Sequence, residues 1–183
     1  MRFAQRRNLL VGLMVLSAAL AVTALAKFKV GSLPKARVAT HAIRTNAPDG
    51  ERTQTLQDLR GQVVVLDFFN VWCAHAREQM PALNRFDDED RERGLRIIGL
   101  FLSDAETTQQ RIDQFIKDQK INFPTSLINY DTFKLFVDSD DLGAPQTLVF
   151  ARDGRLAAHL FGHNDAVEAE LQAVVKRELA RKN

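Results

Sequence analysis

The stretch QVVVLDFF at residues 62–69 is the feature that most narrowly limits the fold of this chain. It is a continuous apolar run rich in β-branched residues, which is typical of a central strand buried on both faces. A second run of this kind, LRIIGLFL, occupies residues 95–102. Strands buried on both faces need covering layers on both sides of their sheet, so the pattern predicts an α/β protein.

The segments around these two runs predict the rest of the fold. Residues 165–181 have amphipathic spacing, and Asp153-Gly154 is a strong hairpin-turn signal between two short strands. The predicted elements after the first strand are a helix at 74–93 bent or interrupted at Pro81, a strand at 95–102, a helix at 104–120 capped by Asp104, strands at 147–151 and 156–161, and a helix at 165–181. This order predicts a central mixed β-sheet flanked by helices on both faces.

An uncharged apolar run, residues 8–26, follows a stub that contains Arg2, Arg6 and Arg7. A basic stub followed by an apolar run is the signature of export. Ala24-Leu25-Ala26 fits the rule for signal-peptide cleavage, whereas a 19-residue run is long enough to remain as a membrane anchor. Both interpretations predict a periplasmic or other extracytoplasmic domain. We favour the anchor, in which case residues 8–26 tether the domain to the inner membrane.

The chain of 183 residues is long enough for one domain of ordinary size. We assign residues 1–26 to the signal peptide or anchor, 27–47 to a tether leading into a first strand, and 48–183 to the folded domain. Without the three arginines of the leader, 22 of the 25 basic side chains remain against 23 acidic ones. A nearly neutral domain of this kind predicts no binding of nucleic acid, and we expect a monomer.

Cys73 is the only cysteine of the chain. An intramolecular disulfide is therefore impossible, and a zinc site built from several cysteines is excluded. The four histidines are scattered along the sequence, so we predict neither a metal site nor a cofactor. Cys73 itself stands where the first buried strand ends and a helix begins. Backbone N–H groups and the helix dipole at such a position stabilise a thiolate over a thiol, which makes Cys73 a candidate nucleophile.

The residues around Cys73 resemble the thioredoxin superfamily, and most of all its membrane-tethered thiol-disulfide oxidoreductases of the TlpA and ResA type. Phe68, Phe69, Trp72 and Cys73 fit the motif F-W-x-x-W-C, with Phe69 at the second aromatic position. The other matching stretches are residues 59–65 for the approach to the central strand, Arg77 with Met80-Pro81 for C-R-x-E-M-P, residues 143–147 for the loop G-v-P-x-T, and residues 150–162 for the closing hairpin. The resemblance spans residues 48–181 and implies a thioredoxin-like fold with a cis proline at Pro145.

This sequence departs from that family at the residues that carry the chemistry. The motif C-x-x-C reads Cys73-Ala74-His75-Ala76, so alanine replaces the second, resolving cysteine. The glutamate expected before Met80 is Gln79. A dithiol site releases its partner when the second thiolate attacks the mixed disulfide, so Cys73 needs an outside thiol for that step.

Five further positions complete the predicted site. Asp67 matches the buried aspartate of thioredoxins, which implies a role as proton acceptor, and burial on an apolar strand predicts a raised pKa. His75 either favours the thiolate by its proximity or is a solvated loop residue. Pro145 is expected to present the backbone of Ala144 to an extended partner chain opposite Cys73, and Trp72 is expected to border that groove.

Three functions follow from these residues as alternatives. The leading hypothesis is monothiol thiol-disulfide exchange through Cys73 with a cysteine-containing protein or a low-molecular-weight thiol, in redox homeostasis or in the maturation of envelope proteins or cytochromes. The second is a non-catalytic module that holds a partner peptide between Trp72 and Pro145, with Cys73 a relic that packs. A peroxidase of the peroxiredoxin class needs Pro-x-x-x-Thr-x-x-Cys, and Leu66 and Asn70 stand at its proline and threonine positions. We reject the peroxidase on that mismatch.

Overall fold

The apolar run at 62–69 forms strand β3 (Val63–Phe69), in which every side chain is buried. The second run forms strand β4 (Leu95–Leu102), which lies parallel to β3. These elements belong to a computed structural model that describes residues 29–137 and 142–181. The predicted leader lies outside the described residues. Within those ranges, no helix combines the length and the apolarity needed to cross a membrane.

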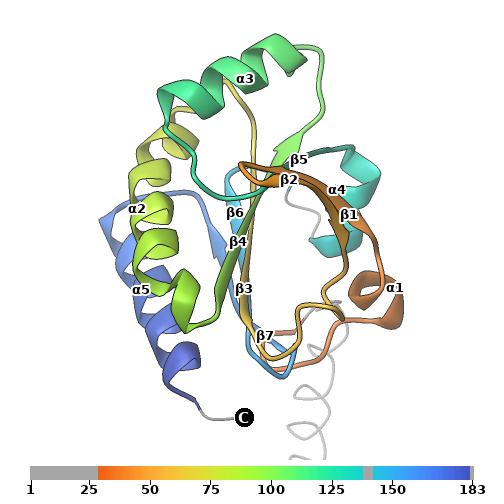
Figure 1. Cartoon of the computed structure of the whole chain (residues 1–183), viewed down its shortest axis with the longest axis vertical. Helices are drawn as coiled ribbons and strands as arrows, with labels where there is room; N and C mark the ends of the chain where they lie inside the picture. The colour runs from red at the N-terminus through yellow and green to blue at the C-terminus, as the bar shows by residue number, and fades with distance from the viewer. Residues whose placement is uncertain (1–28, 138–141, 182–183) are drawn as a thin grey trace, which may run out of the picture.

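Seven strands form one mixed sheet in the order β2-β1-β5-β4-β3-β6-β7 (Figure 1). Strands β3, β4 and β5 are parallel, and β6 pairs with β3 in the antiparallel sense. The remaining strands are β1 (Ile43–Ala47), β2 (Gly50–Gln54), β5 (Thr125–Ile128), β6 (Gln146–Phe150) and β7 (Leu156–Phe161). The predicted hairpin is confirmed, because β6 and β7 pair as antiparallel neighbours across the Asp153-Gly154 turn.

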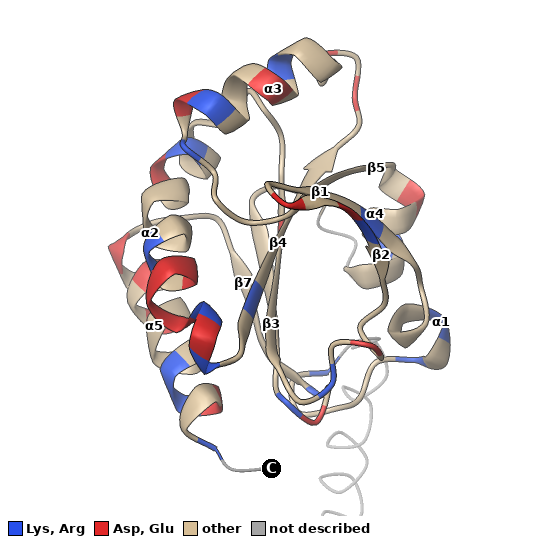
Figure 2. Ribbon diagram, viewed as in Figure 1, with Lys and Arg blue, Asp and Glu red and all other residues tan. Residues whose placement is uncertain are grey.

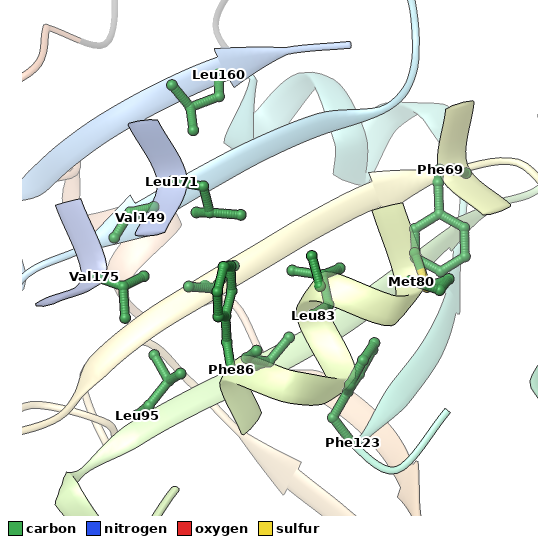
Figure 3. Packing of buried hydrophobic residues seen from close by; sticks show 14 of the residues in the cluster. Phe69, Met80, Leu83, Phe86, Leu95, Phe123, Val149, Leu160, Leu171 and Val175 are labelled. Carbon is green, nitrogen blue, oxygen red and sulfur yellow. The ribbon is translucent and has the colours of Figure 1, made fainter. Parts of the chain in front are cut away.

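Helices cover both faces of this sheet, as predicted (Figure 1). One face is covered by α2 (Ala74–Asp90), α3 (Gln109–Asp118) and α5 (Asp165–Ala180), and the other by α1 (Ala36–Ala39) and α4 (Tyr130–Phe136). Charged residues lie mainly on the helices and in the loops, and the central strands carry few of them (Figure 2). Figure 3 shows Leu83 and Phe86 of α2 packing against the sheet beside Leu171 and Val175 of α5.

The sheet begins earlier in the chain than residue 48. Strand β1 pairs along its whole length with β2, and Val38 and Ile43 are buried in the core under α4. The segment assigned to a tether and an entry strand therefore contains that strand as β1, together with the short helix α1, which was not predicted. Strand β5 and helix α4 were not predicted, because four and seven residues are too few to show a clear periodicity.

Two helices differ from their predicted form. Helix α2 runs through Pro81 without interruption, and Pro81 lies on its exposed side, where water can satisfy the carbonyl that proline leaves unpaired. Helix α3 begins at Gln109, after Thr108, whose hydroxyl accepts from Arg111 N at 3.4 Å. Asp104 is therefore not the cap of this helix.

Candidate active site

Cys73 is the residue that immediately precedes helix α2. Its backbone is extended, with φ −73° and ψ 122°, and Arg77 N donates to its carbonyl at 3.3 Å. A turn closed by Cys73 N donating to Asn70 O at 3.1 Å connects it to the end of β3. The buried strand and the helix behind it thus hold the sulfur at the positive end of α2, as the sequence predicts.

The Cys73 thiol faces the loop that contains Pro145. Its Sγ lies 3.7 Å from Ala144 O, a distance at which the thiol donates a weak hydrogen bond to that carbonyl. The Ala144–Pro145 peptide bond is cis, and Pro145 is buried. Only 8% of Cys73 is exposed, so a disulfide partner can reach the residue over a small area alone.

Trp72 forms the exposed wall beside Cys73, with 51% of its surface accessible. Its indole Nε1 donates to Asp104 Oδ2 at 2.8 Å, and the buried Asn70 amide donates to the same oxygen at 2.8 Å. The other carboxylate oxygen, Oδ1, accepts from Glu106 N and from the Thr107 hydroxyl. Asp104 thus fastens the Cys73 loop to the loop that follows β4.

The predicted role of Asp104 as a helix cap is wrong. Burial opposes ionisation of this carboxyl, but hydrogen bonds from Trp72, Thr107 and the backbone outweigh burial and hold its pKa below the usual value. The ionised group can then accept from several donors at once. Trp72 follows β3 and Asp104 follows β4, and these two parallel strands end at the same edge of the sheet. That shared edge is the signal that would have predicted the contact between Asp104 and Trp72.

Replacing Asp104 by alanine is expected to loosen the wall formed by Trp72. The substitution removes the acceptor of two side-chain donors, one of them buried, and should lower the free energy of unfolding by about 2 kcal/mol. Because Trp72 is the only tryptophan, its emission spectrum reports the change directly. Asp113→Ala, on the exposed side of α3, is the control. An unchanged emission spectrum in Asp104→Ala would show that the bond does not position the indole.

Asp67 lies in the middle of β3, buried beneath α2. Its Oδ1 accepts from the Thr147 hydroxyl at 2.7 Å and from Gln79 Nε2 at 3.0 Å. Burial raises the pKa of Asp67 to about 7, although the hydrogen bonds from Thr147 and Gln79 act in the opposite direction. The raised pKa was predicted, whereas the contact with Gln79 was not. Among the described residues, Asp67 Oδ2 and Gln79 Oε1 are buried oxygens without a hydrogen-bond donor.

Ala76 occupies the position of the resolving cysteine. It is fully buried on α2, one turn before Gln79, so both residues lie on the face of the helix that meets the sheet. The site therefore has a sulfur at the start of α2, a methyl group one turn further, and a carboxyl paired with an amide below them. This arrangement can form one disulfide bond and has no second thiol to break it.

His75 is exposed in the first turn of α2. Within the described part of the chain, no hydrogen bond joins it to Cys73, so the structure does not bring this predicted residue into the thiol's contacts. Arg77, which the sequence offers only as part of a motif, contacts the segment that precedes Cys73. Its guanidinium donates to Val71 O at 2.8 Å and lies 6.0 Å from the centre of the Phe115 ring. Arg77 therefore helps to hold the backbone that leads into Cys73.

A mixed sheet with helices on both faces, a cysteine at the start of the first long helix and a facing proline loop define a protein of the thioredoxin-like fold. Solved structures share this architecture. A thiol:disulfide interchange protein of the thioredoxin family from Chlorobium tepidum aligns with a TM-score of 0.63 and 20% identity, over 76% of this chain and 94% of that one. The thioredoxin domain of a thiol-disulfide oxidoreductase from Bacteroides vulgatus aligns with a TM-score of 0.62 and 18% identity, over 81% and 99%.

The chain belongs to the AhpC/TSA family, whose model matches residues 38–159. It is also similar to the thiol-disulfide oxidoreductase ResA of Bacillus cereus, with 27% identity over 122 residues, which are 65% of this chain and 67% of the relative. The matched region covers about two thirds of the length of these ResA relatives from Bacillus species. The residues matched by the family model include β3, Cys73 and the Pro145 loop.

Proposed function

We propose that this protein is an extracytoplasmic thiol-disulfide oxidoreductase of the ResA type that works as a monothiol through Cys73. The observation that carries the proposal is the position of Cys73 Sγ, at the start of α2 and 3.7 Å from Ala144 O in the Pro145 loop. The similarity to thiol-disulfide oxidoreductases supports the same chemistry. Because the buried Ala76 stands in place of the resolving cysteine, the exchange chemistry can use only the thiol of Cys73.

The reaction has two exchange steps. The Cys73 thiolate attacks one sulfur of a disulfide R–S–S–R′, forming Cys73–S–S–R and releasing R′–S⁻. A thiolate from a second molecule then attacks the R sulfur, forming a new disulfide and restoring the Cys73 thiolate. One disulfide is consumed and one is formed, so the protein itself is neither oxidised nor reduced over the cycle.

The residues beside Cys73 support a cysteine-containing peptide or a small thiol compound as the partner. Trp72 supplies an exposed apolar wall, and the Ala144 carbonyl, which accepts from the thiol, is the backbone group next to the sulfur. An extended chain that pairs with this backbone would bring its own sulfur close to Cys73. The extracytoplasmic part of the proposal depends on the export pattern of residues 1–26. In that compartment the protein would serve redox homeostasis or the maturation of envelope proteins or cytochromes.

One observation favours a second candidate, the non-catalytic binding module. Only 8% of Cys73 is exposed, and its thiol is engaged by Ala144 O, as expected for a sulfur that packs. In that case Trp72 and the Pro145 loop would hold a peptide without forming a covalent bond. Peroxide reduction has less support, because Asn70 replaces the threonine of the peroxidase motif and its amide donates to Asp104.

Cys73→Ser separates the two candidates. The full-length protein and the variant are each incubated with glutathione disulfide and with envelope extract, and the products are analysed by mass spectrometry with and without reductant. Exchange chemistry predicts one glutathionyl group on the wild-type protein, reductant-sensitive partners, and complete loss of both in Cys73→Ser. Capture of the same partners by both proteins, insensitive to reductant, would contradict the redox proposal and support the binding module.

A further inference from the structure

The chain enters the described domain through a turn that is fixed to the sheet. Gly31 N donates to Leu156 O at 2.7 Å, and Leu156 N donates to Ser32 O at 2.9 Å. The Ser32 hydroxyl and amide both donate to Lys29 O, which closes the turn. The point at which the preceding residues join the domain is therefore fixed beside the start of β7.

This point lies at the opposite end of the sheet from Cys73. Strand β7 begins at Leu156, next to the 152–155 turn, and Gly61 N near the start of β3 donates to Arg152 O in that turn. Cys73 follows the other end of β3 (Figure 1). Seven residues of strand at about 3.3 Å each separate the two ends by about 23 Å.

The end where the chain enters carries exposed apolar and basic side chains together. Val30 and Leu33 are 55% and 58% exposed and are two of the five large hydrophobic residues on the described surface. Lys29, Arg37 and Arg60 are exposed in the same region. We call these five residues the basal patch. Arg60 belongs to it because it lines a small cavity together with Pro34, which follows Leu33.

The charge of this end differs from that of the domain as a whole. Residues 27–183 contain 22 basic and 23 acidic side chains, yet the loops around the basal patch are mostly basic (Figure 2). Their acidic residues are Asp58, which accepts from Thr55, and Asp153, which pairs with Arg155. Within residues 29–137 and 142–181, Lys29, Arg37 and Arg60 have no ion pair of their own.

We propose that the basal patch is a contact surface for an anionic membrane, so that the domain stands on the bilayer with Cys73 and Trp72 facing away from it. This inference rests on the extracytoplasmic location in the proposed function and on residues 8–26 being retained as a membrane anchor. The uncharged run of residues 8–26 ends three residues before Lys29, so a tethered domain necessarily has this end near the lipid. Apolar side chains beside lysine and arginine are the composition that binds at a lipid surface. Lysine and arginine side chains near such a surface are attracted to its anionic lipids.

Energy transfer from tryptophan to a dansyl-labelled lipid tests the orientation. The full-length protein is reconstituted into vesicles of 70% phosphatidylcholine and 30% phosphatidylglycerol that contain a trace of the labelled lipid. The native Trp72 reports the distance of the active-site end, and Leu33→Trp in a Trp72→Phe background reports the basal patch. The proposal predicts transfer several-fold stronger from position 33 than from position 72. Equal transfer from both positions would overturn it.

Charge reversal tests whether lipid contact holds this orientation. Arg37→Glu with Arg60→Glu, in the Trp72 protein, is expected to raise transfer from Trp72 as the domain tilts, and Glu89→Lys, on the exposed side of α2, is the control. No change in the double variant would overturn the role of the patch. Flotation with the vesicles separates the two proposals: protein that floats but shows equal transfer contradicts this inference alone, whereas protein that does not float contradicts the tether and this inference together.

Discussion

Replacing Asp67 by asparagine is expected to stabilise the protein strongly at pH 8 and only weakly at pH 4. The folded protein keeps a proton on Asp67 up to pH about 7, whereas the unfolded chain releases it near 3.8. Between these values the folded state binds more protons, so rising pH favours unfolding. The stability present below pH 4 is lost as the pH passes 7, and the difference amounts to about 4 kcal/mol. Asparagine at this position has no proton to lose, so this loss does not occur.

The contacts of Asp67 explain why asparagine fits. The Oδ1 of the new side chain can accept from Thr147 and Gln79 as the carboxylate does. Its Nδ2 takes the place of the unpartnered Asp67 Oδ2 and adds a donor to a site in which Gln79 Oε1 also lacks one. Urea unfolding at several pH values measures the effect, and Asp113→Asn is the control for an exposed acid. A variant whose stability falls with pH as steeply as that of the wild type would show that Asp67 is not the group that titrates.

Ala76→Cys is expected to give the protein a second, resolving thiol and convert it into a dithiol protein. Positions 73 and 76 are separated by one helical turn, which suits the Cα separation of about 5.5 Å that a disulfide needs. The new thiolate can attack a mixed disulfide at Cys73 from within the molecule. We therefore expect the lifetime of the glutathionyl adduct to fall by roughly tenfold or more, because an intramolecular step replaces a bimolecular one.

Thiol titration and a turnover assay with reductant and insulin measure this gain. The oxidised variant should have no free thiol, and its reduced form should have two. The added sulfur enters a fully buried position, so the variant is expected to lose about 1 kcal/mol or more of stability when reduced. Ala180→Cys, at the exposed end of α5, adds a thiol at the opposite end of the domain and is the control. An adduct lifetime equal to that of the control would show that position 76 cannot reach the Cys73 disulfide.

Local patterns in the chain were enough to predict the central elements. Strands β3 and β4 are long runs in which nearly every side chain is apolar, and the Asp153-Gly154 turn fixes the hairpin that follows. The same patterns failed for β5 and α4, which are too short to show a period. They also failed for Asp104. An acidic residue before a helix resembles a helix cap in the sequence, whether or not a tryptophan from another loop donates a hydrogen bond to it.

The sequence by itself determined that this protein has one cysteine thiol, at the junction of a buried strand and a helix, and no second thiol to resolve a disulfide. Only the tertiary structure decided what surrounds that sulfur. Cys73 meets Ala144 across 71 positions of sequence, Trp72 meets Asp104 across 32, and Asp67 meets Thr147 across 80. These contacts depend on which strands are neighbours and on their register, and no local spacing in the chain encodes either of them.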